Sequence, residues 1–116
     1  MKTIITSSKA PKALGPYNVA NRFGNFLFLS GQLGLDPTTN ELVPGGVEAE
    51  TRQSLTNLKY VLEEAGSSLD QVLKTTVFLR DMNDFARMNA IYGEFFTKNF
   101  PASSTCLLYT SDAADE

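Results

Sequence analysis

Residues 47–65 read VEAETRQSLTNLKYVLEEA, and this stretch decides the fold. Its apolar residues recur at the spacing that places side chains on one face of a helix. The positions that share this face are Leu55, Leu58, Val61, Leu62 and Ala65. Two glycines precede the stretch, and Gly66 follows it, where helices commonly end on a left-handed residue. The pattern predicts an amphipathic helix with one face on a core.

Short apolar runs bounded by turn residues predict strands on both sides of this helix. The predicted strands are residues 3–6, 17–22, 26–33 and 72–79. The run FLFLSGQL at 26–33 is rich in aromatic residues, which is typical of a buried strand. Gly24-Asn25 is a turn pair that would join it to the preceding strand. The run at 72–79 alternates apolar and β-branched side chains between two faces.

A second helix is predicted after Asp84, which is a suitable N-cap residue. The stripe expected to be buried consists of Phe85, Met88, Tyr92, Phe95 and Phe96. Phe100-Pro101 should end this helix, because the residue before a proline is disfavoured in helical conformation.

The predicted order is β-β-β-α-β-α with a terminal strand to follow, which indicates a single α+β domain. The strands carry more apolar surface than two helices would cover. We therefore expect a second buried face, against partner subunits.

Composition and charge exclude several functional classes. The chain has 10 Lys and Arg against 13 Asp and Glu, and three of the acidic residues (Asp112, Asp115 and Glu116) lie at its end. The rest is electrically balanced without a basic patch, so no nucleic-acid partner is expected. No stretch reaches the roughly 18 apolar residues of a membrane helix, and no signal peptide is evident. We therefore expect no membrane association and a cytoplasmic location.

The absence of histidine limits the chemistry. It excludes a Ser-His or Cys-His catalytic pair and any histidine-containing metal cage. We expect neither a metal nor another cofactor.

The end of the chain, CLLYTSDAADE at 106–116, resembles the in-frame translation of a sequencing-library adapter. On that interpretation residues 1–105 form the domain, residues 106–116 are a non-native tail, and the sequence is of metagenomic origin. The last strand of the fold would then be missing, and Cys106 would have no role. The alternative is a natural, divergent C-terminus.

Four blocks of sequence occur in a characteristic order. They are LGPY at 14–17, LSGQ at 29–32, TTVFL at 75–79, and DFARMNAIY at 84–92 with FPA at 100–102. Together they resemble the RidA/YjgF family of reactive-intermediate (enamine/imine) deaminases over residues 3–105. The resemblance implies a chorismate-mutase-like α+β fold and a homotrimer with ligand sites between subunits. It also implies hydrolysis of 2-aminoacrylate and related 2-imino acids to keto acids and ammonia.

The resemblance gives roles to individual residues. Tyr17 matches the family's active-site tyrosine and Asn89 an asparagine beside the site, so these two are the predicted catalytic residues. Gly31 matches a glycine that lets substrate approach the backbone, and Ser30 adjoins it as a further substrate-binding residue. Each residue also has a purely structural interpretation. Tyr17 could be a packing tyrosine and Asn89 an ordinary polar residue on the helix surface. Gly31 could mark a strand bulge, and Ser30 could satisfy backbone groups.

Ser103 departs from the family pattern. It follows Phe-Pro-Ala, where the family has an arginine that grips the substrate carboxylate through a bidentate pair. Ser103 and Thr105 are predicted to bind substrate. A serine hydroxyl cannot replace a guanidinium fork, so reduced or altered activity is expected. The family's water-positioning glutamate belongs to the final strand and is expected to be lost with it.

Two functions therefore stay open. One is a deaminase of an imine or related metabolite, and the other is a non-catalytic small-ligand-binding or regulatory trimer. The ribonuclease role attached to some relatives is disfavoured by the missing basic stripe and the absence of histidine.

Overall fold

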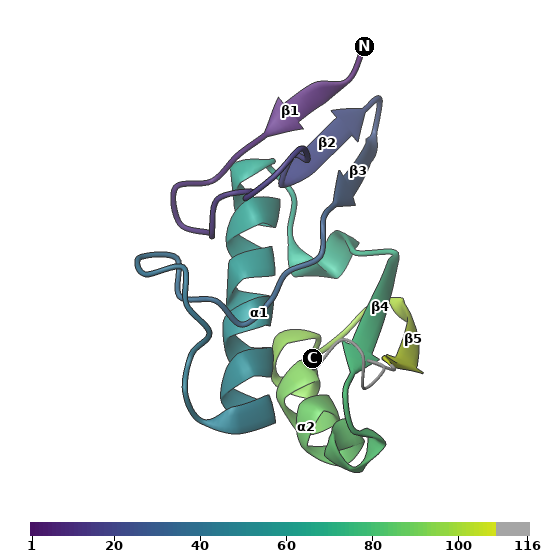
Figure 1. Cartoon of the computed structure of the whole chain (residues 1–116). Coiled ribbons are helices and arrows are strands. Elements are labelled where there is room, and N and C mark those ends of the chain that lie inside the picture. Colours follow the sequence, from purple (N-terminus) through teal and green to yellow (C-terminus); the bar gives the residue numbers. More distant parts are fainter. Residues whose placement is uncertain (109–116) are drawn as a thin grey trace.

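The computed structural model describes residues 1–108, and its elements follow the predicted order (Figure 1). They are β1 (Thr3–Ile5), β2 (Ala20–Phe23), β3 (Phe26–Leu29), α1 (Gly46–Glu64), β4 (Lys74–Leu79), α2 (Phe85–Phe95) and β5 (Ala102–Leu107). Single 3-10 turns at Leu69–Gln71 and Met82–Asp84 precede β4 and α2. The α+β class is confirmed. No helix in the described part of the chain is both long enough and apolar enough to cross a membrane.

The first three strands form an antiparallel sheet in the order β1-β2-β3. The predicted Gly24-Asn25 turn joins β2 to β3, with Phe23 opposite Phe26. Gly24 has a φ of 60°, a left-handed value that glycine adopts without strain.

The aromatic run does not form one long buried strand, contrary to the sequence-based expectation. β3 ends at Leu29, and Phe26 and Phe28 are 60% and 70% exposed. Their side chains lie on the sheet face that α1 does not cover, because successive residues of a strand point to opposite faces. Leu33, Leu73 and Phe78 are also exposed, in line with the expected surplus of apolar surface.

β4 and β5 form a separate two-stranded parallel sheet, with Thr75 opposite Ser103 and Val77 opposite Thr105. The expectation that the last strand is missing was therefore wrong. Backbone pairing depends little on side-chain identity, and the ladder continues past Thr105 to Leu107. The predicted boundary at residue 106 falls inside β5, and most of the predicted tail, 109–116, lies outside the described residues. The adapter origin of the tail stays a prediction.

Helix α1 agrees with its predicted bounds and buries the predicted face. Val61 is completely buried in a core with Ala10, Val19 and Ala20, so the C-terminal half of α1 packs on the first sheet (Figure 1). Gly66 ends the helix with a φ of 79°. The N–H of Gly66 donates to the Glu63 carbonyl, and the next N–H donates to the Leu62 carbonyl. These two bonds are those of a Schellman cap.

Helix α2 ends earlier than predicted, at Phe95 rather than at Phe100-Pro101. Phe96 adopts an extended conformation and is 2% exposed, so burial of its ring turns the chain out of the helix. That ring lies 4.5 Å from the ring of Tyr92. Asp84 is the N-cap residue, as predicted, but its carboxylate makes no capping bond and instead pairs with Arg87.

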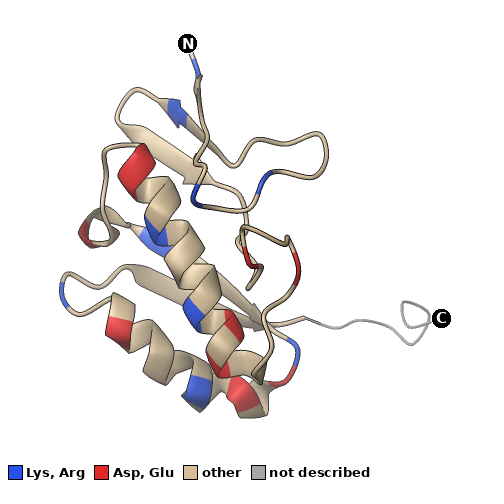
Figure 2. Cartoon of the chain, turned by 90° about the vertical axis from the view of Figure 1, so that its left-hand side faces the viewer, with Lys and Arg blue, Asp and Glu red and all other residues tan. Residues whose placement is uncertain are grey.

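The two helices are joined at the surface by an ion pair. Arg52 of α1 donates to both carboxylate oxygens of Glu94 of α2, at 2.9 and 3.2 Å. The hydrogen bond from Arg52 lowers the pKa of Glu94. Both side chains are half exposed, so this pair orients the helices more than it stabilises them. Figure 2 shows acidic and basic residues interspersed along both helices.

Helix α1 also fixes the segment that follows β3. The amide nitrogen of Asn57 donates to the carbonyls of Leu33 and Leu35, at 3.2 and 2.9 Å, and Asn57 is fully buried. Its oxygen accepts from Gln53 at 2.9 Å. One turn away, the Ser54 hydroxyl donates to the carbonyl of residue 32 at 2.8 Å. These bonds hold residues 32–35 across the helix.

We expect Asn57→Leu to lower the free energy of unfolding by about 1–3 kcal/mol, because two backbone carbonyls would lose their buried donor. Urea denaturation measures this change. The same substitution at Asn89, which is exposed on α2, is the matched control and should shift stability by only about 0.5 kcal/mol. Equal losses of unfolding free energy in the two variants would show that the Asn57 hydrogen bonds do not contribute measurably to stability.

Candidate functional site

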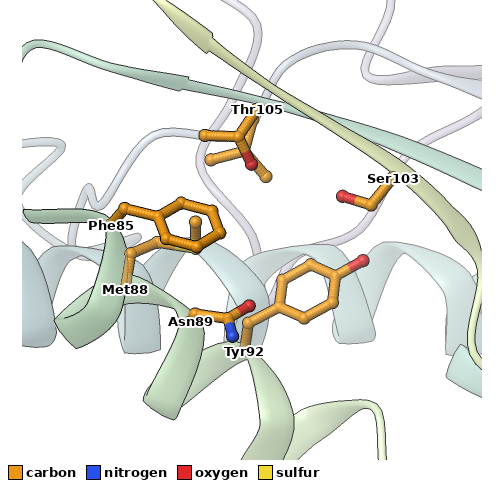
Figure 3. A pocket seen from close by; sticks show the side chains of 7 residues that line it. Phe85, Met88, Asn89, Tyr92, Ser103 and Thr105 are labelled. Atoms are coloured by element: carbon orange, nitrogen blue, oxygen red, sulfur yellow. The ribbon is translucent and has the colours of Figure 1, made fainter. Parts of the chain in front are cut away.

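A cavity of about 310 Å³ lies between α2 and the β4–β5 pair (Figure 3). Its lining residues are Val77, Phe85, Met88, Asn89, Tyr92, Ser103 and Thr105. Four of them come from α2 at spacings of three and four residues, which places them on one helix face. Ser103 and Thr105 are two apart on β5 and therefore share a sheet face.

Hydroxyl groups form a connected chain at one side of this cavity. The Tyr92 hydroxyl lies 2.7 Å from the Thr75 hydroxyl, and the Thr75 hydroxyl donates to that of Ser103 at 3.2 Å. The pairing of Thr75 with Ser103 across the parallel strands creates the second contact. The first arises because α2 packs its Tyr92 against β4.

Three of the six predicted site residues meet at this cavity. Asn89 projects from α2, and Ser103 and Thr105 face it from β5 (Figure 3). The other three, Tyr17, Ser30 and Gly31, are not among its lining residues.

Tyr17 lies in a second, smaller hollow of about 130 Å³ beside the N-terminal sheet, together with Lys12 and Asn18. Its side chain is half exposed, and its hydroxyl accepts a hydrogen bond from the N–H of Leu14 at 3.3 Å. The Tyr17 side chain is therefore accessible from the surface of the chain.

Ser30 and Gly31 lie just beyond β3. The Ser30 hydroxyl donates to the carbonyl of Asn18 at 2.6 Å, which is the structural role foreseen as its alternative. Gly31 is exposed, and a Cβ added there would meet nothing within 4 Å. Space for a ligand therefore exists next to its backbone.

The sequence analysis missed several residues of the pocket and of the hydroxyl chain beside it. Tyr92, Met88 and Phe85 were assigned to the buried stripe of the second helix, and Thr75 to an ordinary strand position. The spacing of Tyr92 from Asn89, three residues along one helix, would have placed both at one site. Nothing in the sequence gives the parallel register that brings Thr75 to Ser103.

Metal binding finds no support in the described part of the chain. Residues 1–108 contain no group of three or more Asp, Glu or Cys side chains arranged to hold a metal ion, and the sequence has no histidine. The chemistry available at the cavity is that of hydroxyl and amide groups.

Comparison with known proteins places the chain in a family. The sequence model of the endoribonuclease L-PSP family matches residues 7–108. A RutC family protein of Pyrococcus horikoshii is 52% identical over 102 residues, covering 88% of this chain and 81% of that protein. The 2-iminobutanoate/2-iminopropanoate deaminase of Bos taurus is 45% identical over 102 residues, covering 88% and 74% respectively. The chain belongs to the RidA/YjgF family.

Solved structures of the RidA/YjgF family have the same fold. The YjgF gene product of E. coli superposes with a TM-score of 0.86 at 42% identity, covering 91% of this chain and 85% of that one. TdcF of E. coli, solved with bound serine, gives a TM-score of 0.86 at 38% identity, with 91% and 85% covered. The family and its α+β fold, both predicted from the sequence blocks, are confirmed.

Two glycines in the segment after β3 should respond differently to the same substitution. A Cβ at Gly34 would lie 2.7 Å from the Cα and carbonyl oxygen of Glu50, so Gly34→Ala should cost about 1–3 kcal/mol of stability. Gly31→Ala should leave the Tm unchanged but weaken ligand binding, if the family role of Gly31 holds.

Thermal denaturation and ligand titration of the two variants measure these effects separately. A Gly31→Ala protein with unchanged ligand affinity would contradict a ligand-facing role for Gly31.

Proposed function

We propose that this chain is a subunit of a deaminase that hydrolyses reactive enamine or imine intermediates, such as 2-aminoacrylate or related 2-imino acids, to keto acids and ammonia. The observation that carries the proposal is the meeting of Asn89, Ser103 and Thr105 at one cavity. Relatives named 2-iminobutanoate/2-iminopropanoate deaminase, at 45% identity over most of the chain, support it.

The reaction itself requires neither a metal ion nor a histidine. Water attacks the imine carbon, the C=N electron pair moves to nitrogen, and one proton of the water passes to that nitrogen to give a carbinolamine. The amino group then takes the proton of the hydroxyl group, the C–N bond breaks, and ammonia leaves the keto product. Because the imine carbon is already electrophilic, the protein needs only to orient substrate and water and to relay protons.

The proposed site is completed between two copies of the chain in a homotrimer. Asn89, Ser103 and Thr105 belong to one copy, and Tyr17, Ser30 and Gly31 to the next. The half-exposed Tyr17 hydroxyl and the open space at Gly31 support this arrangement. So do the exposed aromatic side chains of β3, which a second copy would bury. We place the trimer in the cytoplasm.

A second candidate function is a non-catalytic small-ligand-binding or regulatory trimer of the same fold. Ser103 favours it, because the family's carboxylate-gripping arginine is replaced by a neutral side chain. The endoribonuclease named by the family model is disfavoured, because acidic and basic residues are mixed over the helices (Figure 2) and histidine is absent.

The deaminase proposal is tested by generating imines in the presence of the purified full chain. An amino-acid oxidase acting on several amino acids supplies 2-imino acids, and semicarbazide trapping follows their decay. We expect faster decay than in buffer for at least one imine. Asn89→Ala should slow the enzyme about 10-fold or more, the scale of a lost proton-transfer or orienting group.

Glu63→Gln, at an exposed position on α1 away from the cavity, is the control and should retain full activity. Ligand binding without acceleration of any imine would instead support the non-catalytic trimer.

The shared site is tested by mixing two variants of reduced activity. Tyr17→Phe and Asn89→Ala spoil opposite halves of the site, so a random mixed trimer would rebuild about a quarter of its sites from two intact halves. Co-expression and imine-decay assays should therefore recover activity that neither variant shows alone. Mixed trimers with no recovered activity would place the whole site within one copy.

A further inference from the structure

The cavity between α2 and β4–β5 is polar yet uncharged. None of the seven described residues that line it carries a charge. Its polar groups are the hydroxyls of Tyr92, Ser103 and Thr105 and the amide of Asn89, and they face apolar side chains such as Phe85 (Figure 3). From these seven residues a carboxylate would gain only neutral partners in exchange for the water it loses, which disfavours the charged group.

The hydroxyl chain has a defined direction. A threonine hydroxyl has one proton, and that of Thr75 is donated to Ser103. Either hydroxyl can donate in the 2.7 Å contact between Thr75 and Tyr92, and donation by Tyr92 leaves the Thr75 proton for Ser103. Ser103 accepts at the end of the chain, and within residues 1–108 no hydrogen bond donated by its hydroxyl is found. Its proton is therefore available to a ligand.

This arrangement offers a ligand one hydrogen-bond donor, the Ser103 hydroxyl, instead of the two parallel donors of a guanidinium group. A single hydroxyl matches a single carbonyl oxygen, whereas a carboxylate is best held by a two-pronged cation. Because each hydroxyl of the chain polarises the next, the terminal donor at Ser103 is strengthened. Asn89 supplies both a donor and an acceptor on the facing helix, which suits the N–H and C=O groups of an amide.

We propose that this site selects ligands with an uncharged carbonyl group, above all primary amides, over the corresponding carboxylates. The inference rests on the proposed function and deepens it. The substrate class becomes 2-imino amides, which water converts to 2-oxo amides and ammonia. Ser103 would bind the amide oxygen, and Thr75 and Tyr92 would act as positioning residues through it.

The matched probes are 2-oxopropanamide and 2-oxopropanoate, which differ in the amide and carboxylate groups. Their affinities for the full chain are measured by calorimetry or ligand-observed NMR. We expect the amide to bind roughly three- to tenfold more tightly than the acid, the worth of one net hydrogen bond. Equal binding, preference for the acid, or no binding of the amide would overturn the proposal.

Variants of adjacent residues make the test specific. Ser103→Ala should remove the preference for the amide, and Tyr92→Phe should reduce it by taking away the first donor of the chain. Ser104→Ala is the control, because Ser104 is exposed on β5 and does not line the cavity. It should leave both affinities unchanged. Ser103→Arg should reverse the preference in favour of the acid, and failure of that reversal would count against charge as the cause.

This test and that of the proposed function can fail independently. Amide-selective binding without hydrolysis of any imine would retain the specificity and reject the deaminase. Hydrolysis of 2-imino acids in preference to 2-imino amides would retain the deaminase and reject the specificity.

Discussion

The buried amide of Asn57 is the constraint on which the arrangement of the molecule depends. It satisfies the backbone carbonyls of Leu33 and Leu35, in a segment that has left the N-terminal sheet and pairs through an isolated bridge between Leu35 and Leu42. Without these bonds the two carbonyls would lose their donor, and the Ser54 hydroxyl would remain as a hydrogen bond from α1 to this segment. Gly34 makes the contact possible, since the backbone there touches the helix at Glu50. The position of Gly31, which directly precedes this segment, depends on these hydrogen bonds.

The elements were predictable where local chemistry decides them. The stripe on α1, the glycine that ends it and the hairpin at Gly24-Asn25 were all read from short-range patterns. The predicted element boundaries were wrong where tertiary contacts determine the residue at which an element ends. β3 stops at Leu29 because the chain turns to meet Asn57, and α2 stops at Phe95 because Phe96 is buried. Neither contact can be predicted from the periodicity of apolar residues in the sequence.

The candidate site was predictable only in part, for a related reason. Asn89, Ser103 and Thr105 came from matching a family pattern, and the fold brings them together. Tyr92 and Thr75 were invisible as polar site residues, because their side chains fit the apolar and β-branched patterns of core elements. Only the parallel register of β4 and β5 reveals that their hydroxyls connect to Ser103. Register is set by long-range pairing, which no stretch of a single strand encodes.

The parallel pairing of β4 with β5 makes the cavity the product of one continuous segment. Parallel strands need a crossover between them, and here the crossover is α2 itself, so every lining residue lies between positions 77 and 105. The described lining of the pocket thus comes from a single β-α-β unit, whereas the exposed Tyr17 belongs to the N-terminal half of the chain. Substitutions that reshape this lining can therefore arise in the C-terminal half without altering the sheet of the N-terminal half.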